Sequence, residues 1–216
     1  MNSSQTSGSE PNARQAEVLD AALHLLVEDG HRLTMASVAR RASCSKETLY
    51  KWFGDRDGLL SATVQYQASR VHVPAVDPAR IDRASLSARL EDFAAKWLSV
   101  ISSDTSLALN RVAIGQAASD KGHLGAIVLR HGRFALGERL KPVLEAGRAA
   151  GLLQFVDAEA AFQTFFGLIA RDVHIRLLLG DSLTLTAAGI EADAAAAASQ
   201  FFALYGAEAP AGKTGS

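Results

Sequence analysis

The sequence predicts an all-α protein, and three observations support that fold class. Hydrophobic residues make up 48% of the 216-residue chain, and alanine and leucine are the most frequent among them. Apolar side chains recur at spacings of three and four residues, which is the period of an amphipathic helix. Proline is rare, with only Pro74, Pro78 and Pro142 between the two tails, so long helices can run without interruption.

Helix caps and apolar periodicity together predict the extent of each helix. The expected helices cover residues 13–29, 35–42, 46–53, 56–72, 85–101, 107–118, 124–150, 158–179 and 187–205. Because Pro142 removes one backbone hydrogen bond from the stretch 124–150, we expect a kink there. The polar segments 1–12 and 207–216 are expected to be a disordered arm and a disordered tail.

Residues 33–60 are the most informative stretch of the sequence. Three preferred N-cap residues each precede an apolar-periodic run, namely Thr34, Ser45 and Asp55. In the middle run Leu49 and Phe53 lie four residues apart and face inward, which leaves a polar face outward. A short amphipathic helix held by a partner helix across a tight turn is the geometry of a helix-turn-helix, which reads the major groove of DNA.

The charge of this stretch differs from that of the whole chain. The full sequence has a formal net charge of −1, which gives no reason to expect a general polyanion binder. Between Arg32 and Arg56, however, six basic side chains stand against two acidic ones, Glu47 and Asp55. A basic patch on a small helical unit favours contact with the phosphates of DNA.

The same stretch resembles the DNA-binding domain of the TetR family of bacterial transcription regulators. The family pattern has a threonine before an Ile/Val-Ala pair, a serine at the end of the turn, then Thr-Leu-Tyr, a phenylalanine, a basic residue and a leucine. The matching positions here are Thr34, Val38, Ala39, Ser45, Thr48, Leu49, Tyr50, Phe53, Arg56 and Leu59. The chain departs from the pattern at Ser43, where glycine is usual, and at Glu47, where a small residue is common.

The resemblance implies a DNA-binding domain, and the outward face of its middle helix nominates the contact residues. We expect Lys46, Thr48 and Lys51 to reach base edges, because lysine can approach guanine acceptors and threonine the thymine methyl. The candidates for phosphate contacts, which set the register without reading sequence, are Thr34, Ser45, Tyr50, Trp52 and Arg56. For Trp52, packing on the flank of the helix is the alternative.

Three other residues of the stretch receive simpler interpretations. Arg40 and Arg41 are interpreted as a solvated face with at most one phosphate contact. Cys44 is interpreted as packing filler, because a thiol sensor needs an exposed and activated thiolate. It is the only cysteine in the chain, so no internal disulfide is expected.

The resemblance also implies that a second domain binds an inducer in a cavity between its helices. The expected division is a helix-turn-helix domain over 13–60 and a helical ligand-binding and dimerisation domain over 61–206. Aromatic side chains would form the wall of the cavity, and histidine or arginine would supply polar contacts. The candidates are Trp97, Arg111, His131, Phe134, Phe162, Phe166 and His174. Ordinary core packing is the alternative for each of them.

An aromatic seam in the last two long helices predicts a two-fold dimer. The stretch 158–179 carries more aromatic side chains than one neighbouring helix needs, and a run of alanines in 187–205 would let a partner approach closely. Two helices from each chain would then form a four-helix bundle. The expected interface residues are Phe165, Ile169, Phe201, Phe202 and Tyr205.

Several classes of function receive no support from the sequence. It has no glycine-rich phosphate loop, no cluster of histidine and cysteine at metal-ligand spacing and no nucleophile elbow, so we expect no catalytic residues, metal or cofactor. It has no run of about eighteen apolar residues and no signal-peptide pattern, so we expect no membrane span. These expectations describe a cytoplasmic protein that is not an enzyme.

The predicted function is therefore that of a ligand-responsive, homodimeric transcriptional repressor that binds a near-palindromic operator in double-stranded DNA. Its expected partners are the operator, a second copy of the chain and a small-molecule inducer, with activation left open as the alternative to repression. The alternative of another class is a small-molecule-binding helical protein that acts through a protein partner without specific DNA binding.

Overall fold

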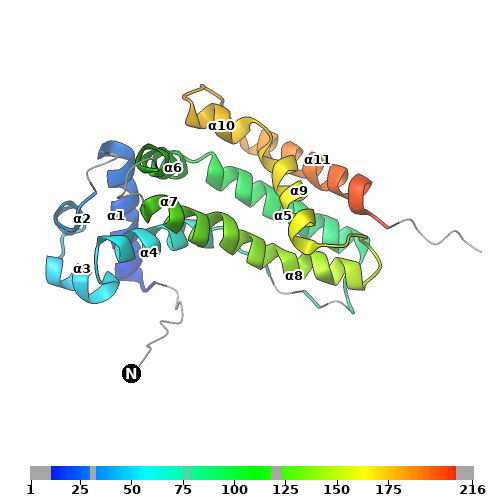
Figure 1. Cartoon of the computed structure of the whole chain (residues 1–216), viewed down its shortest axis with the longest axis horizontal. Helices are drawn as coiled ribbons and strands as arrows, with labels where there is room; N and C mark the ends of the chain where they lie inside the picture. Colours follow the sequence, from blue (N-terminus) through cyan, green and yellow to red (C-terminus); the bar gives the residue numbers. More distant parts are fainter. Residues whose placement is uncertain (1–10, 30–32, 75, 78, 118–122, 208–216) are drawn as a thin grey trace, which may run out of the picture.

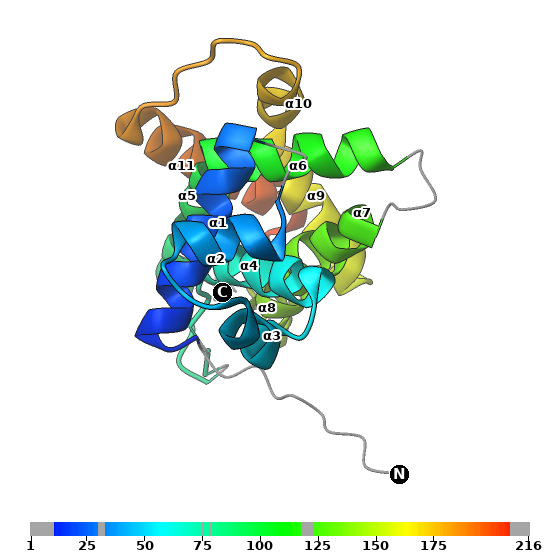
Figure 2. The same cartoon turned by 90° about the vertical axis from the view of Figure 1, so that its left-hand side faces the viewer.

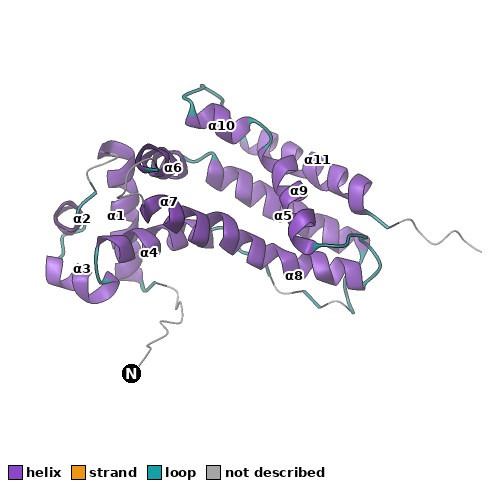
Figure 3. Cartoon of the chain, in the orientation of Figure 1, coloured by secondary structure: helices purple, strands orange, loops and turns teal. Residues whose placement is uncertain are grey.

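The computed structural model describes residues 11–29, 33–74, 76–77, 79–117 and 123–207. Within these residues the chain is helical, and the backbone has no strand beyond one isolated antiparallel bridge between Leu153 and Gly206 (Figure 3). The all-α prediction is therefore confirmed. Most of the expected arm and tail, residues 1–10 and 208–216, lies outside the described residues.

The bounds of the first four helices are close to the predicted ones. They are α1 (Ala13–Asp29), α2 (Met35–Arg41), α3 (Lys46–Phe53), α4 (Arg56–Ser69), α5 (Arg83–Ile101), α6 (Asp104–Gln116), α7 (His123–Val128), the π-helix η2 (Leu129–Phe134), α8 (Ala135–Ala149), α9 (Ala158–Ala170), α10 (Val173–Leu178) and α11 (Ala187–Tyr205). Helix α5 begins two residues earlier than predicted because Asp82, and not Ser85, is its N-cap. Ser85 completes a capping box with Asp82 instead.

Two hydrophobic cores organise the molecule. Figure 1 shows the helices as a head of α1–α4 at one end and a longer body of α5 and α8–α11. The head core is not built from the first four helices alone. Leu109 and Val112 of α6 and Leu124 of α7 are buried in it together with Val18 and Leu49. Helix α4 crosses residue 60 without a break, so the two parts are joined by a rigid element.

The expectation of one long helix over 124–150 with a kink at Pro142 misses a π-helical segment. The helical path is continuous, but residues Leu129–Phe134 form a π-helix between α7 and α8. A π-helix inserts extra backbone into a turn, so the helix after it is rotated relative to the helix before it. Here it separates α7, which packs on the head, from α8, which packs in the body. Pro142 lies exposed within α8.

The expectation of one helix over 158–179 is also wrong. Helix α9 ends at Ala170, Arg171 adopts a left-handed backbone with φ 40°, and α10 begins at Val173. Tertiary contacts account for the break. The Arg171 guanidinium pairs with Asp193 of α11 at 2.5 Å. Arg111 of α6 donates from Nη2 to the Leu177 carbonyl at 2.6 Å, which satisfies the end of α10.

The aromatic seam that predicted a dimer interface belongs instead to the body core. Phe165 and Phe201 are fully buried, with ring centroids 5.0 Å apart, and Ile169 and Phe202 are nearly so. Phe201 packs in turn on Tyr205, whose hydroxyl lies 3.0 Å from Thr164 Oγ1 of α9. These side chains are buried in contacts between α9 and α11 of the same chain, so little of their surface is exposed to a partner.

Packing of α8 on α9 gives a test of this core. A Cβ at Gly137 would lie 2.9 Å from Cε1 of the buried Phe162 ring, whereas nothing stands within 4 Å of a Cβ at Gly125. We expect Gly137→Ala to lower the free energy of unfolding by about 1–3 kcal/mol through overpacking. Gly125→Ala should raise it by about 0.5–1 kcal/mol, because alanine loses less backbone entropy in a helix. Urea unfolding followed by circular dichroism would measure both, and equal effects would contradict this packing.

Candidate functional site

Helix α3 is positioned by its caps and by one buried side chain. Ser45 Oγ accepts a hydrogen bond from the Thr48 amide at 3.1 Å, as its N-cap role predicts, and Leu49 is fully buried in the head core. At its other end Asp55 caps α4. A Cβ at Gly58 would stand 1.9 Å from the Phe53 carbonyl oxygen, so only glycine lets α4 start this close to α3.

The turn between α2 and α3 is stabilised by a contact that the sequence does not reveal. Ser43 takes the left-handed conformation, with φ 49°, at the place where the TetR family usually has glycine. Arg14 of α1 donates from Nη2 to the carbonyls of Ala42 at 2.7 Å and Ser43 at 3.1 Å. A charged donor across the end of α2 satisfies carbonyls that the helix leaves open. Cys44 beside it is half-buried.

The predicted base-reading residues all lie on α3, and Figure 2 shows this helix at the end of the molecule that faces the viewer. Lys46 and Lys51 are exposed, and Thr48 is half-buried beneath its cap to Ser45. Among the described residues neither lysine forms an ion pair. We name Lys46, Thr48 and Lys51 the reading face.

The residues predicted to contact phosphates differ in whether their side chains already have a partner within the chain. Tyr50 is 52% exposed. Trp52 is half-buried, packed edge-on against Phe53 with ring centroids 6.2 Å apart, which favours its packing alternative. Arg56 donates from Nε to the Leu33 carbonyl at 3.0 Å, so it also braces the start of α2. Thr34 Oγ1 accepts from the Ser37 amide as N-cap of α2.

Part of the basic charge near α3 is neutralised within the chain. Both Nη atoms of Arg41 donate to the two carboxylate oxygens of Glu28, at 2.7 and 2.6 Å. These hydrogen bonds, together with the positive charge of Arg41, hold the pKa of Glu28 below its usual value. Arg41 is therefore tied to α1 by an ion pair on the exposed surface. Arg40 is exposed.

The structure brings together three of the predicted ligand residues. Trp97 of α5 and Phe166 of α9 lie with ring centroids 5.2 Å apart, and Phe162 lies 6.1 Å from Phe166. We name Trp97, Phe162 and Phe166 the aromatic cluster. Phe134 is 55% exposed at the end of η2, on the outer edge of this region.

The predicted polar ligand residues have different roles. Arg111 is committed to the end of α10, so its guanidinium is a helix cap. His131 Nδ1 lies 3.0 Å from Gln65 Nε2 and ties η2 to α4. The ring of His174 is half-buried, and its Nε2 has no hydrogen-bond partner among the described residues. Burial lowers the pKa of His174, and burial followed by the charge of Arg130 lowers that of His131.

Sequence reasoning missed Arg133, which the structure places against the aromatic cluster. Its Cζ lies 4.6 Å from the ring centroid of Phe162 and 4.9 Å from that of Phe166. The signal that could have found it is its position one turn before the buried Leu136 and Gly137, where a basic residue falls on an apolar helix face.

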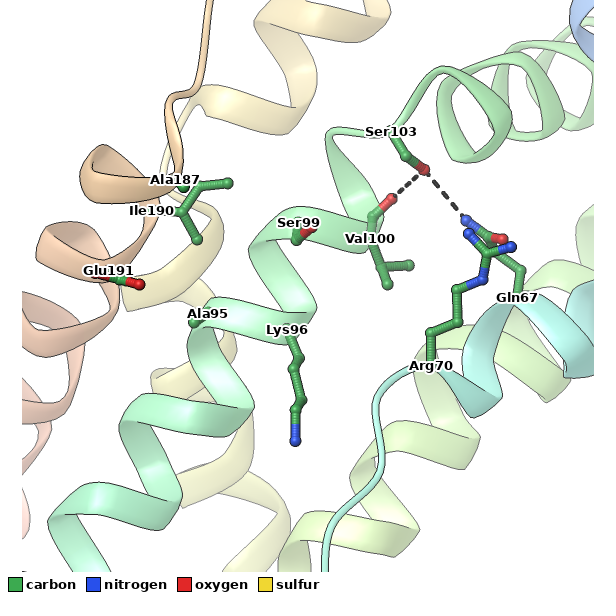
Figure 4. Close-up of a pocket in the computed structure, with 10 residues that line it drawn as sticks. All are labelled: Gln67, Arg70, Ala95, Lys96, Ser99, Val100, Ser103, Ala187, Ile190 and Glu191. Atoms are coloured by element: carbon green, nitrogen blue, oxygen red, sulfur yellow. Dashed lines mark hydrogen bonds between the residues drawn. The ribbon is translucent and has the colours of Figure 1, made fainter.

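A cleft of about 370 Å³ lies elsewhere, between the end of α4, α5 and the start of α11 (Figure 4). Its lining combines the charged residues Arg70, Lys96 and Glu191 with apolar side chains such as Val100 and Ile190. Gln67 donates from Nε2 to Ser103 Oγ at 3.2 Å at its edge. The cleft contains none of the predicted ligand residues, so it is distinct from the aromatic cluster.

Across the described residues, no group of three histidine, cysteine or acidic side chains is arranged to hold a metal ion. None of the described helices combines the length and the apolar character needed to cross a lipid bilayer.

Comparisons with known proteins agree with this geometry. Residues 18–63 match the family described as bacterial regulatory proteins, tetR family. Residues 88–207, more than half of the chain, match the C-terminal domain of AefR-like transcriptional repressors. The crystal structure of a TetR regulator from Agrobacterium tumefaciens is 47% identical, with a TM-score of 0.77 over 92% of this chain and 97% of that one. The chain belongs to the TetR family of DNA-binding transcription regulators, which are not enzymes.

The chain is also similar to the regulators FrrA and BetI. The flavonoid-responsive regulator FrrA is 27% identical, with a TM-score of 0.66 over 91% of this chain and 98% of FrrA. The transcriptional regulator BetI of Paraburkholderia phytofirmans is 46% identical over 54 residues, and that of Burkholderia mallei 32% over 118 residues. These matches cover 24% and 46% of this chain, and 28% and 60% of the respective BetI proteins. The chain thus spans less than two thirds of either BetI.

The half-buried His174 predicts how stability depends on pH. Because its pKa in the folded chain is below the unfolded value of about 6.5, protonation favours unfolding. This contribution is fully present above about pH 6.5 and is lost as the pH falls through the range below it. We expect His174→Gln to reduce the loss of stability between pH 7.5 and 5.5, measured by urea unfolding.

Proposed function

We propose that this protein is a homodimeric repressor that binds a near-palindromic operator and releases it when a small molecule binds the body. The observation that carries the proposal is the reading face, whose two lysines are exposed and free of ion pairs among the described residues. Unpaired lysines on an outward helix can approach guanine acceptors. Repression in place of activation is supported by the match to a domain described as that of AefR-like repressors.

The connection between body and head supports a conformational mechanism. Helix α4 begins beside the reading face, and its far end is held by the body through Arg139, which donates to the Ala68 carbonyl at 2.6 Å. The run of α7, η2 and α8 forms a second link. A ligand that favours a different position of these elements lowers operator affinity by its difference in affinity for the two states.

The aromatic cluster guides the choice of inducers to test. FrrA is described as flavonoid-responsive, and a planar polyphenol would suit a site lined by the aromatic cluster. Flavonoids are therefore reasonable members of a first ligand panel for this chain. Compounds without a ring have no comparable support from these side chains.

The outer faces of α9 and α11 are our proposal for the dimer contact. The aromatic side chains of these helices are buried in the core. The side chains that the helices expose include small ones, among them Gly167 of α9 and Ala192 and Ala196 of α11. Leu204 near the end of α11 is 63% exposed. Small residues permit close helix packing in a four-helix bundle of two chains. Two reading faces about 34–36 Å apart would then meet successive major grooves.

DNA contact is tested by a matched pair of substitutions in α3. We expect Lys51→Ala to weaken the best site by about 1–3 kcal/mol and to relax preference at one base pair, because it removes a base contact. Tyr50→Phe should weaken all sequences alike by about 0.5–1.5 kcal/mol, because a phosphate bond carries no sequence information. Fluorescence anisotropy on operator variants would measure both.

The control for these substitutions is Lys96→Ala in α5, whose ammonium pairs with Asp92 at 2.7 Å, far from the reading face. It should leave operator affinity unchanged. If Lys51→Ala binds every operator variant as the parent does, the reading face is assigned wrongly.

The dimer contact is tested by two substitutions two residues apart. Leu204→Asp places a charge on the exposed face, so the chain should fold normally but run as a monomer in light scattering. Phe202→Asp buries an unpaired charge in the core, where Phe202 is 7% exposed, and should unfold the chain. A folded Leu204→Asp variant that stays dimeric at micromolar concentration would move the contact to another surface.

A further inference from the structure

We propose that the inducer is an organic anion with a planar aromatic part, and that Arg133 determines this specificity by pairing with its anionic oxygen atoms. The inference rests on the ligand response proposed above and assigns that ligand a chemical class. It depends on which polar atoms near the aromatic cluster already have partners and which do not.

The guanidinium of Arg133 is held in place by aromatic rings. It lies 4.6 Å from the Phe162 centroid and 4.9 Å from the Phe166 centroid, with Phe134 at 6.0 Å. A cation against ring faces gains electrostatic attraction while its N–H groups, which lie in the guanidinium plane, stay available for other partners. The π-helix at Leu129–Phe134 carries Arg133, and π-helical turns occur frequently at functional sites.

Only part of this guanidinium has a hydrogen-bond partner. Nη2 lies 3.5 Å from Oε1 of Glu159, at the outer limit of a hydrogen bond. The Glu159 carboxylate is shared, because Lys141 Nζ lies 3.2 Å from its other oxygen and Gln163 also donates to it. Arg133 Nη1 is shielded from solvent and has no partner among the described residues. Leaving a buried charged donor unpaired is unfavourable, so an acceptor is missing here.

A second donor beside the same rings is also unpaired. The Trp97 ring lies 5.2 Å from the Phe166 centroid, and its Nε1, which can only donate, has no acceptor among the described residues. Two donors without acceptors call for a ligand that brings oxygen atoms, and the positive charge of Arg133 favours a carboxylate or phenolate. A cationic ligand would be repelled, and a neutral one would leave the charge less well paired. The aromatic cluster suits a flat ring.

The region is accessible from the surface at η2. The side chain of Arg133 is 22% exposed, and Phe134 beside it is 55% exposed. A ligand can therefore reach Arg133 and Phe134 from the surface. Phe162 is fully buried and Trp97 is 7% exposed, so contact with the aromatic cluster requires the helices around it to move apart.

The test uses the full chain and a matched pair of probes, 2-naphthoate and the neutral 2-naphthamide, with isothermal titration calorimetry. The parent should bind 2-naphthoate at least about tenfold more tightly than the amide, which corresponds to about 1.4 kcal/mol. Decanoate, an anion without a ring, should bind more weakly than 2-naphthoate. A parent that binds neither naphthalene probe, or binds both equally, overturns the proposal.

Three variants separate recognition from general stability. Arg133→Met keeps much of the length and apolar packing and should bring the ratio of the two affinities to about one, since it removes the paired charge. Arg130→Met, at an exposed position of the same π-helix, should keep the parental ratio. Trp97→Phe keeps a ring, loses the N–H and should weaken 2-naphthoate about fivefold. An Arg133→Met variant that retains the parental ratio rules out Arg133 as the recognition residue.

Operator binding is measured separately by gel shift in the absence of probe. A chain that distinguishes the probes but binds no operator would contradict the proposed repressor and leave the ligand class intact. A chain that binds its operator but shows no preference for the anion would contradict only the ligand class.

Discussion

Helix α4 is shared between head and body, and the contacts around its C-terminal half hold the two parts of the molecule together. Arg139 of α8 donates to the carbonyls of Ala68 and Val71 at the end of the helix, and the Ala68 carbonyl also accepts from the Val71 amide. Burial lowers the pKa of the Arg139 guanidinium. Arginine side chains stay protonated in proteins, so the bond to these carbonyls is charge-assisted. The buried Gln67 adds bonds to Ser103 and Thr105 at the α5–α6 corner. Any shift of α8 is thereby felt at the end of α4.

The π-helix occupies the other path between the two cores. Its residue His131 contacts Gln65 of α4, and its residue Arg133 contacts the aromatic cluster of the body. A ligand bound at Arg133 would therefore act within a few residues of a contact to the helix that positions the reading face. Because packed interiors shift between discrete arrangements more readily than they deform continuously, such a segment is a suitable place for a two-state change.

Aromatic residues on α9 and α11 could pack either in the core of the chain or against a second copy. In the fold of the single chain they pack in the core. Phe165 and Phe201 are fully buried because α9 and α11 pack on each other and on α5. The surface that we propose for contact with a second copy is the exposed face of these helices, where glycine, alanine and Leu204 stand among polar residues such as Gln163 and Gln200. Identity of residue type alone does not separate these two faces, since both helices are apolar on more than one side.

The sequence by itself determined the all-α class, the helix-turn-helix and most helix boundaries in the head, because caps such as Thr34, Ser45 and Asp55 act over three residues and leave a local pattern. It also nominated Trp97, Phe162 and Phe166 as neighbours of one site. Only the tertiary structure decided the break at Arg171, the π-helix, the role of Arg111 as a cap and the position of Arg133. Each of these depends on a partner distant in sequence, such as Asp193 for Arg171, and hydrogen bonds and ion pairs of that kind leave no periodic trace in the chain.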